Sequence, residues 1–531
     1  MTRSRTRRTA ALACAALVAA VLPAQTPTLD DIALHVTNRA GFGWTPALRA
    51  QLTASSTAPA QWIDSQLAPN LGTDAPVVAT LITQIGFPTS EAGFGHQYML
   101  PGRLLTRAFW STWQLNELMT WFWNTHFNRT YLALKFFGPF AGNQDGAATW
   151  HMAADDDFIR ANALGTFESL LKEISTGVAM SIYLDNWLNT ASNPNENFAR
   201  ELLELHTLGQ VNEATGATNF TQQDVLLVTK VLSGWQLVNG PLGKEIVLPT
   251  DPNDPKHDST AKTLFQGTPH TLVIPAGGSA KSDADALFAH LASTDATQEF
   301  VIRKLMRFFL SPTAPQDHAA LIASAKTAWV TNNGNIAKVL EVLLKSTEFL
   351  TAVDRWKLVR NPLRYVVATQ RAVGVQPLDF LTGAPSIFCL TNSIAGMQAM
   401  GQSPFFFPSP DGYPLDNVDQ VGVSAYLDRV DFAGLFDDVP TSFTLNYTAE
   451  QVVIAALQPA GHEDDAVIVA RYLLKMYFAN KPLNTASGTS DLEMVIAALQ
   501  PPLPPSNDAL YAVAVRRACA LINSFTHAAV H

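Results

Sequence analysis

Apolar residues recur at helical spacing along most of this chain, and this pattern limits its fold more than any other feature. Residues 103–127 show it most fully, with one stripe made of Leu104, Ala108, Leu115, Leu118, Met119, Phe122 and His126. Residues 221–235 repeat the pattern and add a cap, because Asp224 follows Thr221 at capping-box spacing. Apolar residues make up 47% of the chain and charged residues 15%, which suits a large buried core. The sequence therefore predicts a mainly α, multi-helix globular body.

Two segments interrupt the helical pattern. Residues 240–275 are rich in Pro, Gly, Asp and Thr with short β-branched pieces, which predicts a short β or irregular excursion. Residues 401–414 contain four prolines, which predicts an extended loop whose Phe405, Phe406 and Phe407 form a strap across the helices. The chain then divides into a leader (1–24), a main helical domain (25–400), a proline and aromatic loop region (401–447) and a C-terminal helical segment (448–531).

The first residues have the composition of a secretory signal peptide. The arginines at positions 3, 5, 7 and 8 precede an apolar run over residues 10–22, and Ala24 ends a small-residue cleavage site. The apolar run is too short to span a bilayer, and no later stretch reaches that length. We therefore expect export to the periplasm, the cell surface or the medium. The sequence leaves open whether the general secretory or the twin-arginine route is used.

Charge and cysteine content limit the partners that we expect. Loss of the four leader arginines changes the formal net charge from −10 to −14, and no basic run remains, so neither nucleic acid nor an anionic membrane is an expected partner. A protein partner in the envelope stays open. Cys389 and Cys519 are the two cysteines outside the leader, and the sequence leaves their pairing open.

Residues 192–209 are more polar than helix packing alone requires. Asn193 is expected as the N-cap, Pro194 at the first helical position and Glu196 as the capping-box acid, and Gly209 ends the helix.

One acid of this helix stands apart from the others. Arg200 lies four residues after Glu196 and four before Glu204, so both acids can pair with it, and Glu201 is left without a local partner. His206 falls about 140° from Glu201 around an α-helix, so these two cannot bind one ion from this helix alone. The spacing of Glu201 and Glu204 is compatible with a metal site that other helices complete.

The remaining candidate residues have both a structural and a functional interpretation. His126 is either a hydrogen-bonded core histidine, or a metal ligand or proton carrier that faces Glu201. Asn195 and Asn197 are either loop-bonding amides or groups that orient a substrate. Binding roles are also considered for Asp185, Asn186 and Arg200.

Several sequence blocks occur in a fixed order: residues 39–43 (RAGFG), 119–127 (MTWFWNTHF), 160–165 (RANALG), 183–186 (YLDN), 192–209, 220–225 (FTQQDV), 232–235 (LSGW), 257–258 (HD), 262–263 (KT), 401–404 (GQSP) and 411–414 (DGYP). Together they resemble the bacterial family catalogued as domain of unknown function 1800. The resemblance runs from about residue 29 to residue 414 and is much weaker after residue 415. It implies an exported, mainly helical protein, and it carries no assigned catalytic residues.

Two functions from different classes remain. The first is an extracytoplasmic, metal-assisted enzyme with Glu201, His126 and Asn197 as catalytic residues, in which Glu201, His126 and Glu204 hold a divalent metal ion. The second is a non-catalytic envelope or surface module in which the polar helix fixes the core. Metal content and the effect of Glu201→Ala on it would separate the two.

The leader makes a direct prediction. If the signal peptide is cleaved after Ala24, the mature chain begins at Gln25. N-terminal sequencing of protein recovered from the envelope or the medium checks this, and a chain that still carries its leader would instead indicate a retained N-terminal anchor.

Overall fold

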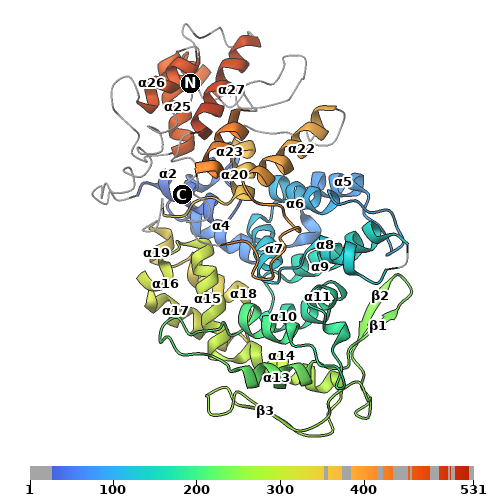
Figure 1. The fold of residues 1–531 in the computed structure, drawn as a ribbon. Coiled ribbons are helices and arrows are strands. Elements are labelled where there is room, and N and C mark those ends of the chain that lie inside the picture. The colour runs from blue at the N-terminus through green and yellow to red at the C-terminus, as the bar shows by residue number, and fades with distance from the viewer. Residues whose placement is uncertain are drawn as a thin grey trace, which may run out of the picture.

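The computed structural model describes residues 27–140, 142–351, 357–372, 384–414, 423–434, 453–454, 457–463, 465–478, 490–499, 503 and 509–524. The predicted leader and the side chain of Cys389 lie outside these residues. The prediction of a mainly α fold is confirmed (Figure 1). Within the described residues, β structure is limited to two small antiparallel sheets and isolated bridges.

The N-terminal third is helical throughout. Its elements are α2 (Leu29–Arg39), α3 (Pro46–Leu52), α4 (Ala58–Leu67), η2 (Leu71–Thr73), α5 (Pro76–Ile85), α6 (Met99–Trp110), α7 (Gln114–His126), α8 (Tyr131–Phe137) and α9 (Gln144–Asn162). Figure 1 shows α6 to α9 at the middle of the molecule.

The next part carries both sheets. Its elements are α10 (Phe167–Thr176), α11 (Val178–Tyr183), η3 (Asn186–Leu188), α12 (Asn197–Glu201), η4 (Leu202–His206), α13 (Gln222–Val231), β1 (Gln236–Asn239), β2 (Lys244–Val247), β3 (Lys262–Leu264) and β4 (Leu272–Ile274). β1 pairs with β2 and β3 pairs with β4, both antiparallel, so the predicted β excursion is confirmed and consists of two hairpins.

Helices complete the chain. They are α14 (Ala280–Ser293), α15 (Asp295–Phe309), α16 (Ala314–Asp317), α17 (Ala319–Thr331), α18 (Ile336–Leu344), α19 (Thr347–Leu350), α20 (Pro362–Ala372), α22 (Ala384–Ala399), α23 (Val423–Gly434), η6 (Gln458–Ala460), α25 (Ala466–Phe478), α26 (Asp491–Leu499) and α27 (Ala509–Ser524). In Figure 1, α25 to α27 lie at one end of the molecule, and α13 and α14 lie at the other. One hydrophobic core joins residues from α2 to α27.

Helix α7 is the centre of this core, because all of its residues are buried. A helix buried on every side cannot leave its polar side chains to water, so each needs a partner inside the protein. Glu117 accepts from Arg160 at 2.7 Å, and Asn124 donates to Asp156 at 2.8 Å.

The prediction of one helix over residues 103–127 is wrong, because the structure divides it into α6 and α7. Asp74 makes the break: its carboxylate accepts from the Thr112 backbone N–H and from the Ser111 hydroxyl, at 2.8 and 2.9 Å. Ser111 has extended dihedrals there. The apolar periodicity continues across a short break of this kind, so it could not reveal it.

The predicted start of the polar helix is also wrong. α12 begins at Asn197, and Asn193 instead forms a tight turn in which it exchanges backbone hydrogen bonds with Thr190. The Asn195 side chain then accepts from the Asn197 N–H at 3.0 Å, which is an Asx turn. Glu196 therefore precedes the helix and does not act as a capping-box acid.

Other local predictions are confirmed. Thr221 and Asp224 form a capping box at the start of α13. The proline-rich loop lies across the helical body as a strap, with Phe405 in the core and Phe406 and Phe407 packed against it.

Asp156 of α9 offers a test of the central polar network. It is buried and accepts from Arg103 at 2.7 Å, from Arg107 at 2.9 Å and from Asn124. Burial alone would raise its pKa, but the two arginines hold the pKa below 3.8. Asp156→Asn is expected to lower the free energy of unfolding by about 3 kcal/mol, since two buried guanidinium groups lose their shared anion.

Asp157 supplies the matched control for this change. It bonds the same two arginines, but its side chain is 56% exposed, so Asp157→Asn is expected to cost less than about 1 kcal/mol. Denaturant unfolding at pH 7 measures both variants. Equal losses in the two variants would contradict a special role for the buried carboxylate.

Candidate functional site

The polar segment ends in an unusual helical turn. α12 is followed directly by η4, a π-helical turn over Leu202–His206. The Thr207 hydroxyl donates to the Leu202 carbonyl at 2.6 Å, and Gly209, at φ +72°, ends the segment as predicted. Single π turns inside helices are frequent at functional sites.

His126 contacts this turn from the end of α7. Its Nε2 lies 3.0 Å from the His206 carbonyl oxygen, and its Nδ1 lies 3.1 Å from Nζ of Lys304 on α15. A carbonyl only accepts, so we assign the ring proton to Nε2, which leaves Nδ1 as the acceptor from Lys304. Burial lowers the pKa of His126 well below 6.5, and the nearby charges of Lys304 and His206 lower it further. His126 is therefore a neutral, fully bonded imidazole.

Lys304 has a different environment from the other lysines. It is partly buried, its amine lies 5.3 Å from the Phe300 ring centroid, and within the described residues it makes no ion pair. Burial lowers the pKa of Lys304 to about 8, with Asp411 acting in the opposite direction and Arg307 adding to the fall. A substantial fraction of this amine is therefore neutral near pH 8.

Glu201 is partly buried and, as the sequence predicted, has no local ion-pair partner among the described residues. Within the part of the chain that the structure describes, its carboxylate makes neither a salt bridge nor a hydrogen bond. Burial, Glu204 and Asp411 raise its pKa above 4.5, and Arg200 only partly offsets this.

Tyr183 and Asp411 connect these groups. The Tyr183 hydroxyl donates to the Pro408 carbonyl at 2.7 Å, and its pKa is raised by burial and by the charges of Glu201 and Asp411. Asp411 also acts on Lys304 and on Glu201. The charge of Asp411 therefore acts on Glu201, Tyr183 and Lys304 alike. His126 joins these groups through its bond to Lys304.

The strap places Asp411 by contacts of its own backbone. Gly412, at φ +73°, lies against the Thr125 carbonyl so closely that a Cβ atom would come within 2.2 Å of that oxygen. Asn128 donates to the Phe407 and Ser409 carbonyls, at 3.1 and 2.7 Å.

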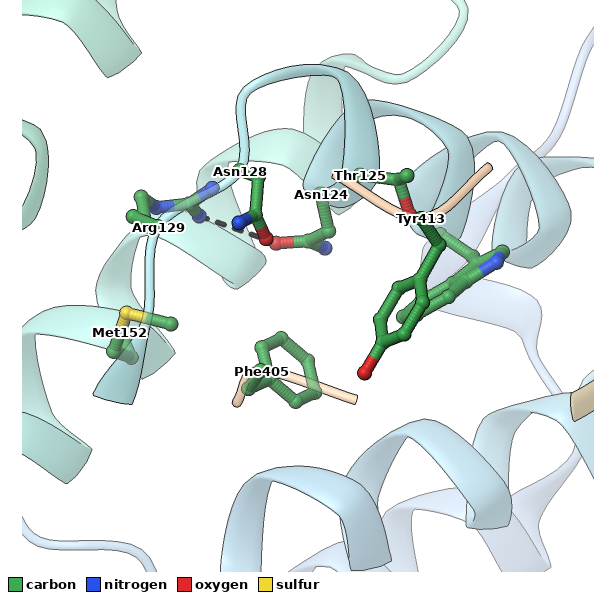
Figure 2. Close-up of a pocket in the computed structure, with 8 residues that line it drawn as sticks. Asn124, Thr125, Asn128, Arg129, Met152, Phe405 and Tyr413 are labelled. Carbon is green, nitrogen blue, oxygen red and sulfur yellow. Dashed lines mark hydrogen bonds between the residues drawn. The ribbon is translucent and has the colours of Figure 1, made fainter. Parts of the chain in front are cut away.

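A small cavity lies beneath the strap. Figure 2 shows Asn124 bonded to Arg129 on one side of it and Phe405 and Tyr413 on the other. Its volume is about 10 Å³, which suits about one water molecule and no larger ligand.

A larger hollow of about 590 Å³ opens elsewhere, between α4 and α18. Its charged residues pair with lysines: Glu341 with Lys338 at 2.9 Å and Asp64 with Lys345 at 2.6 Å. None of the site residues predicted from sequence lines this hollow.

Comparison with known protein families places this chain in one family. A family described as "Protein of unknown function (DUF1800)" matches residues 35–514. The chain belongs to this family. The match extends well past residue 415, into the C-terminal helices, where the sequence blocks alone were weak. No curated protein and no solved structure matches the chain.

The other predicted residues of the polar segment lie at its edge. Arg200 bonds Glu196 at 2.7 Å, as predicted, and also Gln222 at 2.8 Å. Glu204 is partly buried and does not pair with Arg200 in the described structure. Asn197 is exposed, and Asn195 is partly buried and orders the turn before α12.

The two predicted binding residues after α11 differ from each other. Asn186 is 1% exposed and joins η3 to α13, because it donates to the Leu232 carbonyl at 3.2 Å and accepts from Asn189. Asp185 adopts φ +60° and makes no side-chain hydrogen bond within the described residues. Burial alone raises its pKa.

The predicted metal ligands are not grouped as a metal site requires. Within the described residues, no three His, Cys, Asp or Glu side chains come together so that they could hold a metal ion. This applies to His126, Glu201 and Glu204, and both nitrogens of His126 already have partners. The described helices also include none whose length and apolar content would carry it through a bilayer.

Sequence reasoning missed Lys304, Asp411, Tyr183 and His206 as site residues. Tyr183, His206 and Asp411 fall within sequence blocks that carry the family resemblance, so the sequence did contain a signal for them. Lys304 stands between Arg303 and Arg307 on an amphipathic helix and has no such signal.

His206 makes a prediction about stability and pH. It is fully buried, and in the part of the chain that the structure describes its ring nitrogens have no hydrogen-bond partner. Burial, Lys304 and Arg129 lower its pKa to about 3. The unfolded chain takes up this proton below pH 6.5 while the folded chain does not, so stability falls with falling pH, by about 1.4 kcal/mol per pH unit.

His206→Leu is therefore expected to remove about 2 kcal/mol of the stability difference between pH 7 and pH 5, and to leave stability at pH 7 unchanged or higher. Denaturant unfolding at the two pH values measures this. The exposed His462, changed to Leu, is the control. An unaltered pH dependence in His206→Leu would show that His206 is not a buried neutral imidazole.

Proposed function

We propose that this chain is an exported enzyme that carries out acid–base chemistry where α12, η4 and α15 meet the strap, with Glu201 as the proton carrier. The observation that carries the proposal is that this partly buried carboxylate, whose pKa is raised, has no ion-pair partner among the residues that the structure describes. The buried acids Asp156 and Glu117 are paired with arginines, and the buried Asp283 is paired with Lys262. A charge left unpaired in such a protein is costly unless it is used.

The neighbours of Glu201 suit this role. A general acid or base works best when its pKa lies near the working pH, and burial together with Glu204 and Asp411 moves the pKa of Glu201 in that direction. Lys304 adds an amine whose pKa is also moved toward neutrality, from above. His126 is a positioning residue, because it holds Lys304 and does not itself titrate near neutral pH.

The predicted binding residues divide by exposure. Asn197 and Asn195 lie beside Glu201 at the start of α12 and are the amides that a substrate would meet. Arg200 is engaged by Glu196 and Gln222, and it limits the substrate site at its edge. No step is assigned to a divalent metal, because both nitrogens of His126 are engaged and the described residues group no three ligands.

The place of action that we propose is outside the cytoplasm. The leader composition supports export, and the acidic mature chain suits a protein that does not bind nucleic acid.

A second candidate is the non-catalytic envelope module. The observation that favours it is the exposure of Phe94, Phe136 and Phe137, at 72%, 63% and 77%, because large exposed aromatic side chains often mark partner surfaces. This second function gives no reason for the unpaired carboxylate of Glu201.

Glu201→Gln tests the enzyme. The full chain is incubated with a metabolite extract of the envelope fraction, and mass spectrometry follows compounds that are consumed or formed. Wild type is expected to convert at least one compound, and Glu201→Gln to convert it at least about 100-fold more slowly.

Glu173→Gln is the control, because Glu173 is exposed on α10 and takes the same chemical change. It is expected to keep wild-type turnover. The melting temperature of Glu201→Gln should stay within about 2 °C of wild type, since no bond of this side chain is lost. Equal turnover in wild type and Glu201→Gln, or none in either, would favour the envelope module.

A further inference from the structure

We propose that Lys304 is the nucleophile of this site and that it forms an imine with an uncharged aldehyde or ketone. The inference rests on the proposed function and names its substrate class. It makes Lys304 a catalytic residue, held in place by His126.

The bonding of Lys304 suits a nucleophile. His126 Nδ1 accepts one N–H of the amine at 3.1 Å, and Nε2 is tied to the His206 carbonyl, so the imidazole cannot turn to offer a proton to the lysine. A neutral amine bonded in this way keeps its lone pair free. No carboxylate within ion-pair distance in the described structure holds the amine as an ammonium ion.

The surrounding charges select the substrate. Asp411 acts on Lys304 and also on Glu201, the proposed proton carrier, so an anionic substrate such as a 2-oxo acid would meet repulsion from these carboxylates. A cationic substrate would meet Lys304 itself, with Arg307 acting on it from the same helix. An uncharged carbonyl compound meets neither penalty.

Imine formation needs no oxidant or reductant. The amine lone pair attacks the carbonyl carbon while the carbonyl oxygen takes a proton, which gives a carbinolamine. The nitrogen then loses a proton, the hydroxyl takes one and leaves as water, and the C=N bond forms. The three proton transfers fall to Glu201, which gives a proton to the carbonyl oxygen, takes one from the nitrogen and gives one to the leaving hydroxyl, so that the product is the protonated imine. Its raised pKa lets it both give and accept a proton, and the charge of Asp411 acts on both Glu201 and Lys304.

The full chain is treated at pH 7 with glyceraldehyde and sodium borohydride, which reduces any imine to a stable secondary amine, and peptide mass spectrometry locates the adducts. Lys304 is expected to be labelled at least about tenfold more than Lys338, an exposed lysine paired with Glu341. The yield at Lys304 should rise toward a plateau above pH 8. Pyruvate, as the anionic probe, is expected to label Lys304 at least tenfold less than glyceraldehyde does.

The labelling experiment compares two lysines of the wild-type protein, so it does not depend on whether a variant folds. Lys304→Arg, with Lys338→Arg as its control, then shows whether metabolite conversion needs the amine. Labelling of Lys304 no greater than that of Lys338 would overturn the inference, and equal labelling by pyruvate would overturn the assignment of an uncharged substrate. If labelling fails while conversion still depends on Glu201, the imine is wrong and the proposed function stands. If neither occurs, both are wrong.

Discussion

The burial of α7 on every side is the constraint on which the rest of this structure depends. A helix in the middle of the core carries Asn116, Glu117 and Asn124 into a region without bulk water, and each must be bonded there. α9 supplies most of the partners. Asp156 and the arginines that flank it bond to one another across α6, α7 and α9, so the polar bonds fix how the central helices lie.

In the part of the chain that the structure describes, not every buried polar side chain near α7 has such a partner. Around α7 the ionised side chains are paired, whereas at its C-terminal end the pairing stops: His126 bonds a lysine and a carbonyl, and within the described residues the ring nitrogens of His206 have no hydrogen-bond partner. Beside them, the carboxylates of Glu201 and Asp411 make no hydrogen bond or ion pair within the described residues. Proteins leave buried polar and charged side chains without partners mainly at sites of function or strain. The π turn of η4 lies at the same place and turns the His206 carbonyl toward His126.

Local patterns in the sequence predicted the local features well. The Thr221 cap, the pair of Arg200 with Glu196, the lack of a partner for Glu201 and the strap all depend on neighbours a few residues apart or on composition. The errors came from contacts that the apolar periodicity does not encode, whether their partners are near or far along the chain. Asp74 breaks the helix before α7, and Thr190 draws Asn193 into a turn, and neither contact leaves a mark in the periodicity. Lys304 was missed for the same reason, because it becomes unusual only when α15 packs against His126.

The strap shows how this fold can hold a loop and still leave a side chain uncommitted. The bonds that hold its middle go to backbone carbonyls: Tyr183 to Pro408, Asn128 to Phe407 and Ser409, and the Tyr131 N–H to Phe405. Gly412 then brings the backbone against α7, where any side chain would clash with the Thr125 carbonyl. Because the main chain carries the attachment, the carboxylate of Asp411 is needed for none of it. It therefore stays exposed at the edge of the site, where its charge acts on both Lys304 and Glu201.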